Sequence, residues 1–104
     1  MGEMIQIGPV QVSEERLAEL CRRYYVQELS VFGSMARGDD RPDSDVDILV
    51  AFQPDAPIGL IEYARLMEDL SELMGRKVDL VSKKYLKPLI RGEVLQEARL
   101  LYAA

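Results

Sequence analysis

The run DVDILVAF, from Asp45 to Phe52, constrains the fold more than any other part of the chain. Every residue after Asp47 in this run is apolar, and most of them favour extended backbone. An uninterrupted apolar run of this length is typical of a strand that is covered on both faces, because a half-exposed strand alternates between apolar and polar residues. Pro54 and Pro57 follow the run and end it. The sequence therefore predicts a central, buried strand.

Helical and extended patterns alternate around this strand. Ser13 followed by two glutamates predicts the start of a helix over residues 14–24, in which Cys21 is expected to be a core residue. We expect strands over residues 28–32 and 77–82, a brief helix after Gly33, and longer helices over residues 58–74 and from Pro88 onward. The final ARLLYA either continues the last helix or forms a short strand. The predicted fold class is α/β (α+β), a small mixed β-sheet with helices packed on it, in a single domain over residues 1–104.

The two long helices are expected to bury apolar side chains. Four apolar residues of the helix from Pro88 follow a helical spacing: Leu89, Ile90, Val94 and Leu95. The helix over residues 58–74 is expected to bury Leu60, Ile61, Ala64, Met67, Leu70 and either Leu73 or Met74.

Composition excludes several kinds of function. The 104 residues include no histidine and one cysteine, so a Ser-His-Asp triad, an ordinary zinc site and a Cys-His pair are excluded. The net charge of −5 argues against bulk binding of DNA or RNA, and no apolar run is long enough to span a membrane. No secretory signal is apparent and the one cysteine has no partner for an internal disulfide, so we expect a cytoplasmic protein.

Three aspartates are candidates for a metal site. Asp45 and Asp47 are two residues apart in a predicted strand, so their side chains would project to the same side. Asp79 is the one acidic residue of the strand KVDLV and would add a third carboxylate from a neighbouring strand, although it could also cap a strand edge or pair with a lysine. Crowded carboxylates stay ionised when hard divalent cations lie between them. We therefore predict two Mg²⁺ ions, with Mn²⁺ as an alternative, of the kind that promote phosphoryl or nucleotidyl transfer.

A glycine-serine turn is the candidate phosphate site. Gly33 and Ser34 end the first predicted strand, where a glycine allows close approach of a phosphate and the next helical turn offers backbone N–H groups. Arg37 lies one turn later and could reach triphosphate oxygens or the acceptor, or it could be a solvated loop arginine. The basic set Lys83, Lys84, Lys87 and Arg91 is interpreted as a solvated helix start with no catalytic role.

The segments GSMARG and SDVD together resemble the GSxARG…SDxD signature of the DNA polymerase β-like nucleotidyltransferase superfamily. The short chain is most similar to the minimal nucleotidyltransferases, the MNT proteins. The resemblance implies that Asp45 and Asp47 bind both metals, and that Asp79 binds the catalytic metal and favours deprotonation of the acceptor hydroxyl. It also implies that Gly33 and Ser34 hold the β- and γ-phosphates, with Arg37 at the position of the family's motif arginine.

The same resemblance implies a substrate and a partner. Many MNT proteins act as antitoxins of a HEPN-domain ribonuclease toxin, binding it and transferring AMP from ATP to one of its tyrosines. We therefore expect a HEPN-type protein partner, and a homo-oligomer is also possible because no segment is apparent that would hold the acceptor. Two alternatives stay open: an antitoxin that acts by binding alone with a vestigial transferase site, and a nucleotidyltransferase of small molecules such as aminoglycosides.

Overall fold

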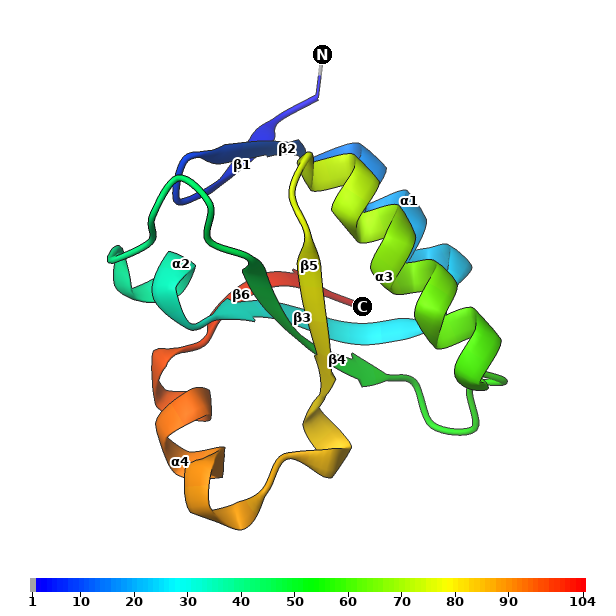
Figure 1. Ribbon diagram of the computed structural model, residues 1–104. Coiled ribbons are helices and arrows are strands. Elements are labelled where there is room, and N and C mark those ends of the chain that lie inside the picture. Colours follow the sequence, from blue (N-terminus) through cyan, green and yellow to red (C-terminus); the bar gives the residue numbers. More distant parts are fainter. Residues whose placement is uncertain (1) are drawn as a thin grey trace.

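The computed structural model describes residues 2–104 and contains a small mixed sheet with helices packed against it (Figure 1). The sheet has the strand order β5 (Val78–Ser82), β4 (Val46–Phe52), β3 (Val26–Phe32) and β6 (Arg99–Ala103). Strands β4 and β5 are parallel, whereas β3 is antiparallel to both β4 and β6. The predicted fold class is confirmed.

The predicted elements are present in the predicted order, and the structure adds a hairpin and a 3-10 turn. The chain opens with a hairpin of β1 (Met4–Ile7) and β2 (Val10–Ser13), which sequence analysis did not predict. Helix α1 (Glu14–Arg23) leads to β3, and the short helix α2 (Ser34–Arg37) follows β3. Helix α3 (Leu60–Met74) joins the parallel strands β4 and β5. The 3-10 turn η1 (Lys83–Tyr85) and helix α4 (Pro88–Glu97) lead to β6, so the tail forms a strand instead of extending the helix.

Strand β4 lies in the middle of the core, as its apolar run predicts. Val46, Ile48 and Val50 are buried in the main cluster, which includes residues of α1 and α3. On the opposite face Leu49 is buried in a second cluster with residues from η1–α4, Leu86 and Val94 among them. Asp47 shares the face of Leu49, because alternate residues of a strand point the same way.

The buried face of α3 agrees with the prediction in the later turns and differs in the first ones. Leu70 and Met74 are buried as predicted, and Met67 and Leu73 pack against the main cluster. Leu66 is also buried, whereas the predicted Leu60 is 85% exposed, Ile61 is 65% exposed and Ala64 is also exposed. At about 100° per residue, Ile61 lies roughly 140° around the helix axis from Leu66, so both cannot face the sheet. The first apolar pair of this helix therefore points outward.

Helix α4 also presents apolar side chains to solvent. Of its four apolar residues at helical spacing only Val94 is buried, and Leu89 is 97% exposed. Ile90 and Leu95 are exposed as well.

Over residues 2–104, no helix combines the length and the apolar character that crossing a bilayer would require.

Candidate active site

Strand pairing brings two of the predicted aspartates together. In the parallel pairing of β4 with β5, Asp47 lies directly opposite Asp79. Directly paired residues of neighbouring strands project to the same face, with the strands about 4.8 Å apart. Both side chains therefore lie on the face of Leu49 and Val81, the side away from α1 and α3. We call Asp47 and Asp79 the acidic pair.

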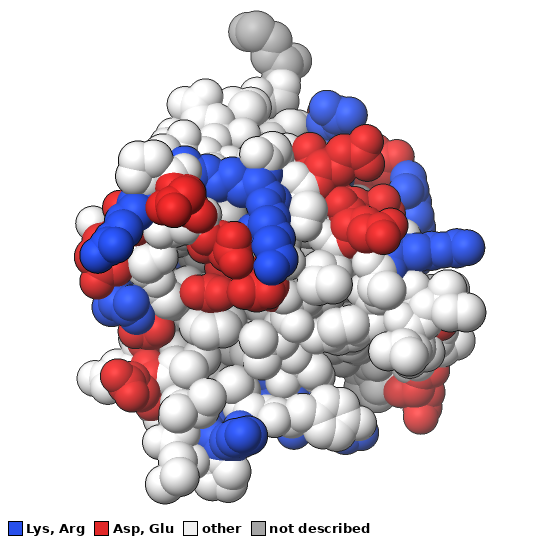
Figure 2. All heavy atoms as spheres, viewed as in Figure 1, with Lys and Arg blue, Asp and Glu red and all other residues white. Residues whose placement is uncertain are grey.

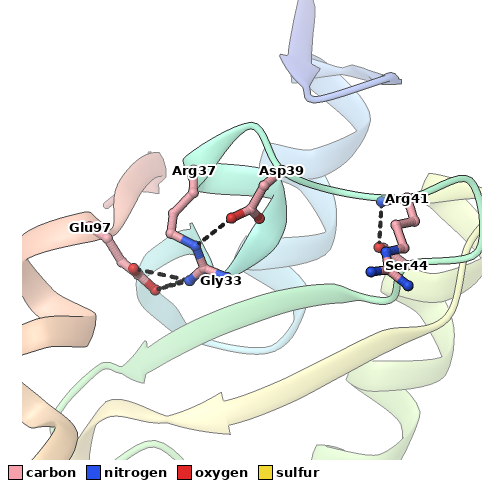
Figure 3. Close-up of polar contacts among 6 residues, drawn as sticks. All are labelled: Gly33, Arg37, Asp39, Arg41, Ser44 and Glu97. Atoms are coloured by element: carbon pink, nitrogen blue, oxygen red, sulfur yellow. Dashed lines mark hydrogen bonds and ion pairs between the residues drawn. The ribbon is translucent and has the colours of Figure 1, made fainter.

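Asp45 lies immediately before β4, two residues from Asp47. Its Oδ2 is 3.8 Å from the Lys77 ammonium group; the Lys77 side chain is largely exposed and the Asp45 side chain is partly exposed. The preceding loop is fixed by Ser44, whose Oγ accepts the Arg41 N–H at 2.7 Å (Figure 3). The Arg76 guanidinium also donates to the Ser44 carbonyl oxygen at 3.2 Å. These contacts fix the loop that places Asp45 next to the acidic pair.

The electrostatics of the acidic pair favour a bound cation. Burial raises the pKa of the Asp47 carboxyl above its ordinary value, and the nearby charges of Asp79 and Asp45 raise it further. Arg37 opposes this effect. In Figure 2 acidic side chains gather where β4 and β5 begin beside α2, with basic side chains around them. A divalent ion would remove the repulsion that raises this pKa.

The donor set fits a hard cation, although the carboxylates do not form a closed cage. Three aspartate carboxylates are the oxygen ligands that Mg²⁺ and Mn²⁺ prefer. Within residues 2–104, however, no three acidic side chains are close enough, as placed, to hold one ion together. The Asp45 carboxylate lies beside Lys77.

Gly33 allows the close approach of Asp47 to the turn after β3. Its backbone angles, φ 73° and ψ −151°, lie in a region that is essentially restricted to glycine. A Cβ atom built at Gly33 would overlap Oδ2 of Asp47 and lie 3.1 Å from its Cγ. Sequence analysis explains this glycine by the close approach of a phosphate. In the structure the Asp47 carboxylate also lies against Gly33.

Ser34 and Arg37 begin and end α2. Ser34 is half-buried, and its carbonyl oxygen accepts the N–H groups of Gly38 and Asp39. The Arg37 Nε donates to Asp39 at 3.1 Å, and its Nη1 donates to both carboxylate oxygens of Glu97 at 3.2 and 3.3 Å (Figure 3). The hydrogen bond to Asp39 raises the pKa of Arg37 above its ordinary value, and the hydrogen bonds to Glu97 raise it further. Arg37 is therefore an anchored side chain, unlike a freely solvated loop arginine.

Glu97 is the site residue that sequence analysis missed. It is the last residue of α4, and its Oε1 accepts the Gly33 N–H at 3.0 Å. Its partners are 60 and 64 residues away in the sequence, so no local pattern links them. The basic residues of η1 and α4 lie elsewhere: Lys83 pairs with Glu28 at 3.3 Å, which is consistent with a structural role.

A separate groove lies at the opposite ends of β4 and β5. Its volume is about 1190 Å³, and it is lined by Phe52, Tyr63, Ser82 and Tyr85, among others. None of the predicted catalytic residues lines it. The acidic pair instead occupies the ends at which both strands begin.

Comparison with known proteins identifies the family. The model of the nucleotidyltransferase domain family matches residues 14–101, which include the acidic pair and the Gly33–Arg37 segment. The chain belongs to this family. Among curated relatives, the protein adenylyltransferase MntA of Thermococcus cleftensis is 48% identical over 79 residues, which cover 76% of this chain and 78% of the relative. This nucleotidyltransferase is thus of the MNT type.

Solved structures agree with this assignment. One that has been assigned as a minimal nucleotidyltransferase is 44% identical, with a TM-score of 0.70, and the match covers 83% of this chain and 86% of the other. A second holds the tri-AMPylated HEPN toxin of Shewanella oneidensis in complex with an MNT antitoxin. Its matched chain is 22% identical with a TM-score of 0.62, covering 88% of this chain and 70% of the other, and this similarity concerns the fold alone.

Proposed function

We propose that this nucleotidyltransferase transfers AMP from ATP to a tyrosine hydroxyl of a HEPN-type toxin, and so acts as the antitoxin of that protein. The observation on which the proposal depends is the pairing of Asp47 with Asp79 beside the Gly33 turn. The proposal is supported by the adenylyltransferase activity for which the Thermococcus relative is named, and by the AMPylated toxin in the Shewanella complex.

The proposed roles are those that the family's SDxD motif implies for these aspartates, and the pairing of β4 with β5 supports them. Asp45 and Asp47 would hold two divalent ions, Mg²⁺ or Mn²⁺, and Asp79 would hold the ion nearest the acceptor. When bound, the ions neutralise phosphate charge and lower the pKa of the acceptor hydroxyl. Asp79 then favours loss of the tyrosine proton. The tyrosine oxygen forms a bond to the α-phosphorus of ATP while the bond to diphosphate breaks, giving AMP-tyrosine and diphosphate.

The triphosphate would lie against the turn after β3. Gly33 and Ser34 would hold the β- and γ-phosphates, and Arg37 would offset their charge. Arg37 is suited to this role because it lies at the end of the four-residue helix that begins with Ser34. These three residues and the acidic pair lie on adjacent ends of β3, β4 and β5.

A protein partner is supported by exposed apolar side chains. Leu60, Tyr85, Leu89 and Leu100 are large apolar residues with most of their surface open to solvent. Leu60 and Tyr85 both line the groove at the ends of β4 and β5, and exposed apolar side chains that lie together mark interaction surfaces in many proteins. The partner proposed here is the toxin, and a second copy of this chain would be the other occupant.

The test is a labelling experiment with the HEPN-type protein encoded nearest to this chain. The two proteins are incubated with Mg²⁺ and α-labelled ATP, and we expect label on a toxin tyrosine. Asp45→Ala/Asp47→Ala should abolish it, whereas Asp43→Ala/Glu68→Ala, which removes the same charge from exposed positions, should not. Equal labelling by both double variants would contradict the proposal.

A second candidate is an antitoxin that neutralises by binding alone. It is favoured by the absence, within residues 2–104, of three acidic side chains close enough to hold one ion as placed. Cells that express the toxin distinguish the two: if Asp45→Ala/Asp47→Ala protects as well as the wild type, binding is sufficient. ATP consumption with small acceptors and no protein partner would instead indicate a small-molecule nucleotidyltransferase.

A further inference from the structure

Glu97 connects the end of α4 to the predicted phosphate turn. Its Oε1 accepts the Gly33 N–H at 3.0 Å, and both of its oxygens accept from Arg37 Nη1 (Figure 3). The Glu97 side chain is only 20% exposed, whereas most surface carboxylates are freely hydrated. A carboxylate that binds a backbone N–H and a guanidinium at once fixes both groups relative to each other.

Two carboxylates together fix the plane of the Arg37 guanidinium. Asp39 binds Nε and Glu97 binds Nη1. A guanidinium has five N–H donors, and Nη2 takes part in no hydrogen bond among residues 2–104. The two carboxylates bind at the two edges of the guanidinium that meet at Nη2, so Nη2 is the nitrogen left to donate to another acceptor, such as a phosphate oxygen.

Glu97 is also linked to the acidic pair through Gly33. The Gly33 residue that it holds is the one whose Cα lies against the Asp47 carboxylate. Movement of Gly33 would therefore change the contact between the phosphate turn and Asp47.

We propose that Glu97 is a positioning residue for the nucleotide: it orients Arg37 so that Nη2 can bind the triphosphate, and it holds Gly33 in place. This inference rests on the proposed function, which it deepens by assigning a role to a residue outside the GSxARG and SDxD segments. In this proposal Glu97 acts through its contacts with Arg37 and Gly33.

The test compares three single substitutions of glutamates in α4. Glu97→Ala removes the carboxylate, Glu97→Gln keeps an oxygen for the Gly33 N–H without the charge, and Glu93→Gln makes the same charge change at an exposed position one turn earlier in α4. Binding of a non-hydrolysable ATP analogue with Mg²⁺ is measured for each by calorimetry, and KM for ATP and kcat are measured with the toxin as acceptor.

We expect Glu97→Ala to bind the analogue about tenfold more weakly and to raise KM for ATP to a similar extent, the loss of roughly one charge-assisted hydrogen bond, while kcat changes much less. Glu97→Gln should lie between Glu97→Ala and the wild type, and Glu93→Gln should match the wild type. Adding Glu97→Ala to Arg37→Ala should cause a smaller loss than Glu97→Ala causes in the wild type, because only the contact with Gly33 then remains to be lost. A purely structural role would lower the melting temperature without this split between KM and kcat.

Tighter nucleotide binding by Glu97→Ala would overturn the inference, since it would mean that Glu97 competes with phosphate for Gly33 and Arg37. Unchanged binding, or losses that add fully to those of Arg37→Ala, would overturn it as well. If Glu97→Ala does not fold, Glu97→Gln decides by the same criteria. A wild-type protein that binds the analogue but labels no toxin contradicts only the proposed acceptor, whereas one that binds no nucleotide overturns both proposals.

Discussion

Replacement of Gly33 by alanine tests the contact on which the candidate site is built. The backbone at φ 73° and ψ −151° would cost an alanine about 1–3 kcal/mol. The new Cβ would also overlap Oδ2 of Asp47, and relief of such overpacking costs about another 1–3 kcal/mol. We expect Gly33→Ala to lower the free energy of unfolding by roughly 2–6 kcal/mol, and the melting temperature by on the order of 10 °C or more.

A matched glycine and a double variant separate the two contributions. Gly75 also has a positive φ, 68°, but nothing lies within 4 Å of a Cβ built there, so Gly75→Ala should cost only about 1–2 kcal/mol of backbone strain. In an Asp47→Ala background Cγ and Oδ2 are gone, and the nearest remaining atom, the Asp47 Cβ, is 3.3 Å away. Gly33→Ala should then cost less than it does in the wild type. Denaturant unfolding followed by circular dichroism measures each step. A cost that is equal in both backgrounds, or no larger than that of Gly75→Ala, would refute the proposed contact.

Two further predictions concern the acidic pair and the core. Because the pKa of Asp47 is higher in the folded protein than in the unfolded chain, the ionised carboxylate destabilises the fold at neutral pH, and acidification through the folded-state pKa removes this penalty. The metal-free Asp47→Asn variant should therefore be more stable than the wild type at pH 7. The difference in stability should shrink as the pH falls toward the ordinary pKa of an aspartate. A difference in melting temperature that stays constant with pH would contradict this. Leu66→Ala should cost about 2–5 kcal/mol because Leu66 is fully buried, whereas Leu60→Ala on the exposed side of α3 should change stability by less than about 0.5 kcal/mol in urea unfolding.

Most elements were predictable because their signals are local. Ser13 caps α1 by accepting the Arg16 N–H at 3.3 Å, as its position before two glutamates predicts. Gly75 ends α3 in the left-handed conformation, and the apolar run of β4 indicated its burial on both faces. Hairpin β1–β2 was missed because its strands have only four residues each, too few for a clear alternation.

Sequence by itself determined the chemistry that is available: carboxylates without histidine, a glycine-serine turn after a strand, and an isolated aspartate in a later strand. These features depend on residue types and on spacings of a few positions. Over such short spacings the local backbone geometry alone decides to which side each side chain points. Only the tertiary structure decided that Asp79 lies opposite Asp47, since that register depends on how α3 returns the chain to the sheet. It also decided that Glu97 binds Gly33 and Arg37, and that Leu60 and Leu89 face outward. Such contacts join residues far apart in the chain, and packing of the whole fold selects them.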